Sequence, residues 1–235
     1  MLEILRADER GTGQHDWLFT RYSFSFAGYY DPKRMGFSVL RVINEDFIKG
    51  EAGFPTHGHK NMEIITYIVD GALMHKDNMG NQSEIRPGEV QRMSAGTGVL
   101  HSEINPIKHT THLLQIWILP EKLAVAPSYE QKSFEEQLKS ANLVLVASRD
   151  GEQGSLSINQ DIKLYASKVK DAGSINLPVA QERRYWLQNI KGDLIINSHD
   201  KNLHLAAGDA LAIDKTNQMQ VTWTQGVEYL FFDLP

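Results

Sequence analysis

Two short segments contain the residues best suited to chemistry in this sequence. One contains His57 and His59, and the other contains His101 and Glu103. In a β-strand, residues i and i+2 point to the same side, so each pair would direct two ligand groups to one point. Two such pairs facing each other inside a barrel would form a pocket of three histidines and one glutamate for a divalent metal ion.

The ligand types restrict the metal without identifying it. The chain has no cysteine, which excludes disulfides, thiolate metal sites and cysteine nucleophiles. Nitrogen and oxygen ligands suit one divalent transition metal, which is Fe, Ni, Mn, Cu, Co or Zn. Three histidines and one glutamate leave one or two coordination positions open. Open positions are typical of a catalytic site rather than a structural one.

Glu63 competes with Glu103 for the fourth ligand position. It follows His59 by four residues, which is roughly 13 Å along a continuous strand and too far to share an ion. A bend at residues 60–61 would bring it back. Strand geometry favours Glu103, and the alternative role for Glu63 is a carboxylate that orients a ligand histidine.

The other polar motifs indicate structure rather than chemistry. The stretch Gly96-Thr-Gly98 lacks the third glycine and the following helix of a dinucleotide-binding loop, so it predicts a tight turn. We expect His109 and His112 in solvent or in the core, and His199 and His204 at the surface.

Composition and charge narrow the class of protein. The 235 residues include 24 basic and 29 acidic side chains, for a net charge of −5. Without a basic excess, we expect small molecules or proteins as partners rather than nucleic acid. No apolar run reaches the roughly 20 residues that span a membrane. The first residues do not resemble a signal peptide, so we expect a cytoplasmic protein.

Strand signals dominate the chain. Short runs rich in β-branched and aromatic residues predict strands over 37–43, 63–69, 112–119, 143–147 and 229–233. Many short strands with frequent turns predict an all-β sandwich or small barrel. The pair Asp70-Gly71 predicts a hairpin. Only Ser128–Ser140 has the pattern of a short amphipathic helix.

The second half of the chain weakly repeats the first. Gly71 and Gly192 each follow a predicted strand, and Gly88 and Gly208 each precede one. The repeat predicts two similar β-domains, at 1–134 and 135–235, joined by the helical segment.

The candidate ligands lie in two motifs that resemble those of the cupins. The first motif covers residues 53–63 and is closed by Gly71, and the second covers residues 88–105. The second departs from many cupins in having Ser94 in place of proline and two additional residues before His101. Those departures, together with residues 24–32 and 93–103, resemble the pirin family, closely over residues 15–120 and more loosely beyond.

The resemblance implies a bicupin, with two antiparallel barrels joined by a short helical linker. It implies one metal in the first barrel, bound by His57, His59, His101 and Glu103, and a second barrel without metal. Similar bacterial pirins are quercetin dioxygenases, which open the central ring of a flavonol with O2 and release carbon monoxide. In that reaction Glu103 is expected to be the general base on the flavonol hydroxyl.

Two other functions fit the same four ligands. Other pirins are metal-dependent regulatory proteins that bind a transcription factor or a metabolic enzyme, so a protein partner is an open alternative. A third interpretation is a cupin of broad specificity for which quercetin is an incidental substrate. We expect a monomer, because two barrels can cover each other's apolar surface.

Overall fold

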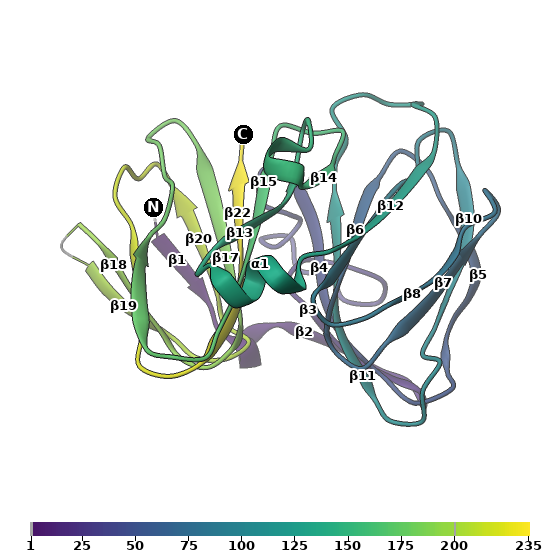
Figure 1. Ribbon diagram of the computed structural model, residues 1–235, viewed down its shortest axis with the longest axis horizontal. Coiled ribbons are helices and arrows are strands. Elements are labelled where there is room, and N and C mark those ends of the chain that lie inside the picture. The colour runs from purple at the N-terminus through teal and green to yellow at the C-terminus, as the bar shows by residue number, and fades with distance from the viewer. Residues whose placement is uncertain (1, 200) are drawn as a thin grey trace.

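The computed structural model describes residues 2–199 and 201–235, and it shows two β-barrels side by side (Figure 1). The first barrel contains β2 (Gly11–Gln14), β3 (Leu18–Tyr22), β4 (Leu40–Ile48), β5 (Gly53–His59), β6 (Glu63–Asp70), β7 (Leu73–Asp77), β8 (Gln82–Ile85), β9 (Glu89–Ser94), β10 (Val99–Ile104), β11 (Thr111–Ile118) and β12 (Ser128–Ser133). The second contains β1 (Leu2–Leu5), β13 (Val144–Ser148), β14 (Leu156–Ser157), β15 (Lys163–Val169), β16 (Gly173–Asn176), β17 (Arg184–Lys191), β18 (Leu194–Ser198), β19 (Lys201–Leu205), β20 (Ala210–Asp214), β21 (Gln220–Trp223) and β22 (Val227–Leu234).

Helical structure is confined to short segments. The helix α1 (Glu135–Ser140) lies between the barrels, and η1 (Ala7–Glu9) and η2 (Glu152–Gly154) are single 3₁₀ turns (Figure 1). Within the described ranges, no helix is long and apolar enough to cross a membrane. The prediction of an all-β protein with two barrels and a short helical link is confirmed.

Both barrels have the same order of central strands. Each combines a seven-stranded sheet with a four-stranded sheet. In the first barrel the orders are β12-β9-β6-β11-β4-β3-β2 and β5-β10-β7-β8. In the second they are β1-β20-β17-β22-β15-β13-β14 and β16-β21-β18-β19. The predicted repeat is therefore confirmed, since Gly71 follows β6 and Gly192 follows β17, which has the same place in its sheet.

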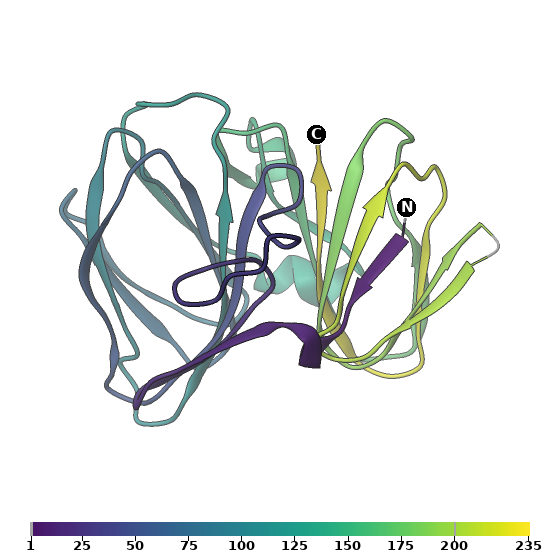
Figure 2. The same ribbon diagram turned by 180° about the vertical axis from the view of Figure 1, so that it is seen from behind.

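The first strand of the chain belongs to the second barrel. β1 pairs antiparallel with β20, and from there the chain crosses to the first barrel, as the view from behind shows (Figure 2). β1 thus takes the place that β12 has in the first barrel. The division of the chain into two domains at residue 135 stays a prediction. β1 is an exception to it, because this strand precedes residue 135 but pairs with the second barrel.

The largest apolar cluster lies between the two seven-stranded sheets. It includes Ile65 and Tyr67 of β6 together with Trp186 of β17 and Phe232 of β22. One face of β6 lines its own barrel and the other packs on the second barrel. For this reason β6 is buried along its whole length except its last residue and reads as a nearly continuous apolar run.

Two local predictions were wrong. Residues 128–133 form the edge strand β12, paired with β9, and the helix begins only at Glu135. Pairing with an exposed sheet edge outweighs a weak helix propensity there. Asp70-Gly71 does not close a hairpin, because β6 pairs with β9 and β11, whereas β7 pairs with β8 and β10. Gly71, with φ of +86°, instead turns the chain from one sheet into the other.

Candidate metal centre

The four predicted ligands lie on two neighbouring strands of the first barrel. β5 carries His57 and His59, and β10 carries His101 and Glu103. The strands are antiparallel, with His101 opposite His57. The two pairs therefore lie side by side in one sheet, and the expectation that they would face each other across the barrel was wrong.

The three imidazoles converge through their Nε2 atoms. His101 Nε2 lies 2.9 Å from His59 Nε2 and 3.1 Å from His57 Nε2. Two nitrogen ligands at right angles around an ion lie about 3.0 Å apart, given metal–nitrogen bonds of about 2.1 Å. Hydrogen bonds cannot satisfy three converging nitrogen lone pairs, whereas one cation can. This donor set therefore fits a single divalent transition metal.

A bulge in β5 orients His57. The register with β10 shifts between His101 and Glu103, so that Glu103 pairs with Phe54 and residues 55 and 56 form the bulge. Proline is tolerated at a bulge, where it need not donate a ladder hydrogen bond. The Pro55 carbonyl accepts a hydrogen bond of 2.8 Å from His57 Nδ1. That bond leaves the lone pair on Nε2, which points to the other histidines.

Burial keeps the other two histidines neutral. Desolvation, reinforced by the neighbouring His57, lowers the pKa of His59 to about 4. Desolvation and the surrounding histidines lower the pKa of His101 to about 2. Both imidazoles are therefore free bases at neutral pH, which is the form that binds a metal ion.

Glu103 is close to this group but does not join it fully. Among residues that the structure describes, His57, His59 and His101 form one group with ligand atoms within 4.8 Å of one another, and His75, His101 and Glu103 form another. Gln115 Nε2 donates a 2.9 Å hydrogen bond to Glu103 Oε2, while the buried Oε1 has no hydrogen-bond partner. Burial raises the pKa of Glu103 to about 7.

Sequence reasoning missed His75 and its partner Asp77. Both lie on β7, which pairs with β10 on the side opposite β5. His75 is fully buried, with its Nδ1 3.4 Å from His101 Nδ1 and its Nε2 3.2 Å from Asp77 Oδ2. The available signal was a third i,i+2 pair of potential ligands, His75 and Asp77, after a glycine turn.

Glu63 does not orient a ligand histidine. Its side chain lies on the face of β6 that packs on the second barrel, where Ser94 Oγ donates to it at 2.5 Å and the Asn159 amide at 3.4 Å. Burial raises the pKa of this carboxyl group. It belongs to the contact between the barrels rather than to the histidine site.

The remaining histidines lie away from the three converging Nε2 atoms. His112 donates a hydrogen bond of 2.9 Å to Glu45 and stacks on Phe47. His109 and His199 are exposed. His204 is exposed as well and donates to Asp193 at 2.9 Å.

An aromatic wall borders the site on the side of His59. The Trp117 ring lies edge-on to the His59 ring at 4.9 Å and to Phe26 at 5.2 Å. Trp117 Nε1 is buried without a hydrogen-bond partner. The wall consists of two nearly perpendicular aromatic rings with one buried, unpaired donor, next to the convergent nitrogens.

Comparison with known proteins supplies the family. The Pirin family model matches residues 5–118, and the model of the quercetinase C-terminal cupin domain matches residues 145–234. A quercetin 2,3-dioxygenase of Escherichia coli is 45% identical, and the alignment covers 100% of this chain and 99% of that protein. The chain belongs to the pirin family.

Other pirins agree with this membership. A pirin-like protein of Caulobacter vibrioides is 36% identical over 99% of both chains. The crystal structure of the bacterial pirin YhhW from Escherichia coli in complex with nickel(II) superposes with a TM-score of 0.93 at 43% identity. It covers 100% of this chain and 99% of that one. In the chain described here, the two similar barrels differ, because among residues 2–199 and 201–235 the converging histidines lie in the first barrel.

Proposed function

We propose that this pirin is a metal-dependent dioxygenase of flavonols such as quercetin. It would bind one divalent transition metal through His57, His59, His101 and Glu103. The observation that carries the proposal is the convergence of three Nε2 atoms, with separations of 2.9 and 3.1 Å from His101. A quercetin 2,3-dioxygenase and a nickel-bound pirin among its relatives support the substrate and the metal.

A metal bound to these residues would supply Lewis acidity toward the flavonol 3-oxygen and bring O2 chemistry to the site. The protein's contribution would be to hold the substrate and move its proton. Glu103 suits that role, because it is a buried carboxylate beside the histidines and its Oε1 has no hydrogen-bond partner within the protein. Gln115 would fix the other carboxylate oxygen and so limit its rotation.

The aromatic wall supports a planar substrate. Trp117 and Phe26 meet edge to face, and Trp117 also packs against His59. A flavonol ring system against this wall would bury apolar area next to the ligand histidines.

The test is turnover by metal-loaded protein under air. We expect the flavonol absorbance band to be lost and carbon monoxide to be released. After chelation of the metal, we expect neither change. Consumption of flavonol without carbon monoxide would contradict the proposed ring opening. Full metal content without any turnover would shift the proposal to a regulatory pirin with a protein partner.

We also propose a monomer. The apolar faces of the two seven-stranded sheets are buried against each other, so their burial needs no second chain. Sedimentation should give the mass of one chain over a wide concentration range. A dimer mass that does not change on dilution would overturn this.

A further inference from the structure

We propose that His75 and Asp77 are positioning residues that hold His101 in the tautomer with hydrogen on Nδ1, so that its Nε2 lone pair faces the metal. The inference rests on the metal site proposed above. It deepens that proposal by explaining how one ligand is prepared before any ion arrives.

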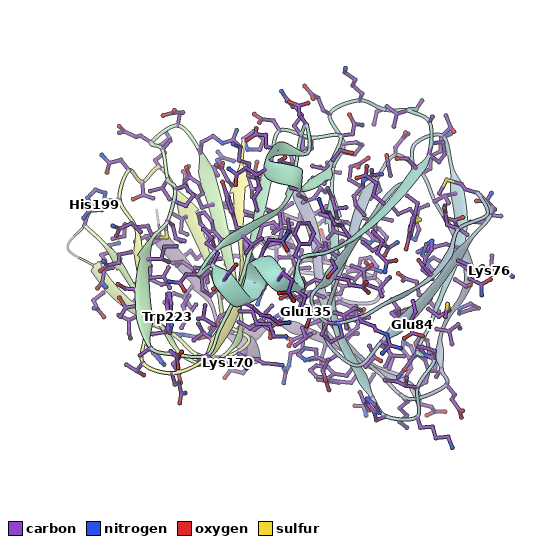
Figure 3. All side chains as sticks on the ribbon, in the orientation of Figure 1. Lys76, Glu84, Glu135, Lys170, His199 and Trp223 are labelled. Carbon is purple, nitrogen blue, oxygen red and sulfur yellow. The ribbon has the colours of Figure 1, made fainter. Side chains whose placement is uncertain are left out.

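The two residues are placed by strand pairing. β7 lies against β10, with His75 opposite Glu103 and Asp77 opposite His101. His75 and Asp77 alternate with Lys76, which points away from the barrel (Figure 3). His75 and Asp77 therefore point inward, and both side chains are fully buried.

Asp77 is held as an acceptor by its own turn. Its Oδ1 accepts hydrogen bonds from the amides of Met79 and Asn81, at 2.9 and 3.0 Å. Its Oδ2 accepts one of 2.8 Å from the Asn81 side chain. Burial alone would raise the pKa of Asp77, but these bonds and the one from His75 outweigh it and lower the pKa. The remaining contact of Oδ2, with His75 Nε2 at 3.2 Å, thus requires hydrogen on that nitrogen.

The ring nitrogen that carries hydrogen in His75 determines which ring nitrogen carries hydrogen in His101. The contact with Asp77 places a hydrogen on His75 Nε2, and a neutral imidazole then has none on Nδ1. Its Nδ1 is then an acceptor, and a donor already faces it, since Gln91 Nε2 lies 3.4 Å away. His101 Nδ1 is also 3.4 Å away and must be a donor to make this contact. A neutral His101 with hydrogen on Nδ1 has its lone pair on Nε2.

His75 has the same role toward His101 as a backbone carbonyl has toward His57, since each accepts a hydrogen bond from Nδ1 of the ligand histidine. The Pro55 carbonyl selects the tautomer of His57, whereas a chain of Asp77 and His75 selects that of His101. Tyr129 stacks on the His75 ring at 4.7 Å between centroids and prevents it from turning. Partners of this kind orient metal-binding histidines, and their loss typically costs about 10- to 100-fold in metal affinity.

The decisive variant is Asp77→Asn. If the amide oxygen keeps the two backbone hydrogen bonds of the turn, the NH2 group replaces Oδ2 and becomes a donor toward His75 Nε2. His75 must then carry its hydrogen on Nδ1, which opposes a hydrogen on His101 Nδ1. The change should reverse both tautomers while leaving the shape of the site almost unchanged.

The readout is long-range ¹H–¹⁵N correlation of the histidine rings in metal-free protein, followed by nickel affinity from chelator competition. We expect His101 with hydrogen on Nδ1 in the wild type and on Nε2 in Asp77→Asn, with nickel affinity lower by about 10- to 100-fold. The matched control is Asp193→Asn, which alters a surface pair with His204 and should affect neither His101 nor nickel binding.

A second variant guards against misfolding. His75→Phe keeps the stack on Tyr129 and removes the acceptor, so nickel affinity should also fall, whereas Lys76→Gln on the outer face should not change it. Hydrogen on His101 Nε2 in the metal-free wild type, or unchanged affinity in both inner variants, would overturn the inference. Because the tautomers are read without metal, a protein that fails to bind nickel yet shows the expected tautomers would contradict the proposed metal site instead.

Discussion

The interiors of the two barrels differ although the order of their central strands is the same. In the first, Thr66 on β6 donates a hydrogen bond to Gln115 on β11, whereas the equivalent strands of the second bring Leu187 beside Phe231. The four-stranded sheet of the first barrel directs histidines and a glutamate inward. The corresponding sheet of the second contributes mainly apolar side chains to the core, among them Leu194, Ile196, Val221 and Trp223, with Ser198 buried at the end of β18.

The difference shows how one fold separates stability from chemistry. Apolar side chains of the first barrel form two small clusters, one around Ile68 and Leu113 and one around Ile64 and Met93. The polar ligands and their partners are interior residues outside both clusters. The second barrel has one continuous cluster instead, and the seven-stranded sheets of both barrels share the large apolar contact between them. We infer that apolar packing in the second barrel stabilises the protein, whereas interior positions of the first barrel are occupied by the polar residues of its site.

The largest expected effect is on metal binding by the first barrel. The double variant His57→Ala/His59→Ala removes two of the three convergent nitrogens, so elemental analysis should find the metal lost almost completely. The matched control is His199→Ala/His204→Ala, two exposed histidines of the second barrel. A full complement of metal in the first variant would show that the site is misplaced.

The second expected effect is on stability and concerns the second barrel. Trp223 is buried in its apolar cluster, and Trp223→Ala would leave a cavity that costs about 3–5 kcal/mol in the free energy of unfolding. Denaturant unfolding measures this loss. Metal content per folded chain should not change, and a loss of metal from the folded variant would contradict the separation of roles between the barrels.

A third effect tests whether Glu103 acts beyond ligation. Glu103→Gln keeps a carbonyl oxygen but removes the basicity, so turnover per bound metal should fall by about 100-fold or more, while metal content falls only partly. Glu63→Gln, in the contact between the barrels, should leave turnover within a few-fold. If activity in Glu103→Gln simply follows metal content, Glu103 is a ligand and not the base.

The smallest effect is a pH dependence of metal affinity. In metal-free protein the Glu103 carboxyl keeps its proton below about pH 7, since burial raises its pKa, and the nearby Asp46 carboxylate adds to the shift. Metal binding must displace that proton. Affinity should rise up to about tenfold per pH unit below pH 7 and level off above it. His59 and His101, with pKa values of about 4 and about 2, are already neutral near pH 7 and do not contribute to the pH dependence in that range.

Calorimetry in buffers of different ionisation enthalpy would count the proton released. The same measurement on Glu103→Gln should show fewer protons released and a shallower profile between pH 5.5 and 7. A profile that stays steep in this variant would assign the proton to another group.

Much of the fold was predictable because its signals are local. Alternating and continuous apolar runs predicted β6 and β11 almost residue for residue, and the repeated glycines predicted two similar barrels. What failed depends on contacts distant in sequence. Residues 128–133 form a strand because they pair with the otherwise unpaired edge of β9. In the same way, β1 belongs to the second barrel because it pairs with the otherwise unpaired edge of β20.

The candidate site shows the same limit. The i,i+2 spacing indicated which side chains share a face, but not that β5 and β10 are neighbours in one sheet. His75 was missed because its role depends on β7 lying on the other side of β10. Spacing along the chain therefore identified candidate ligands, while the partner that orients one of them required the sheet order.

The most direct test of the difference between the barrels is the position of the metal itself. Crystals of the nickel-loaded protein should give one anomalous peak per chain at the nickel absorption edge. We predict that the peak lies about 2.1 Å from the Nε2 atoms of His57, His59 and His101, with none in the second barrel. A peak in the second barrel, or a peak of the first barrel away from those three nitrogens, would contradict the account.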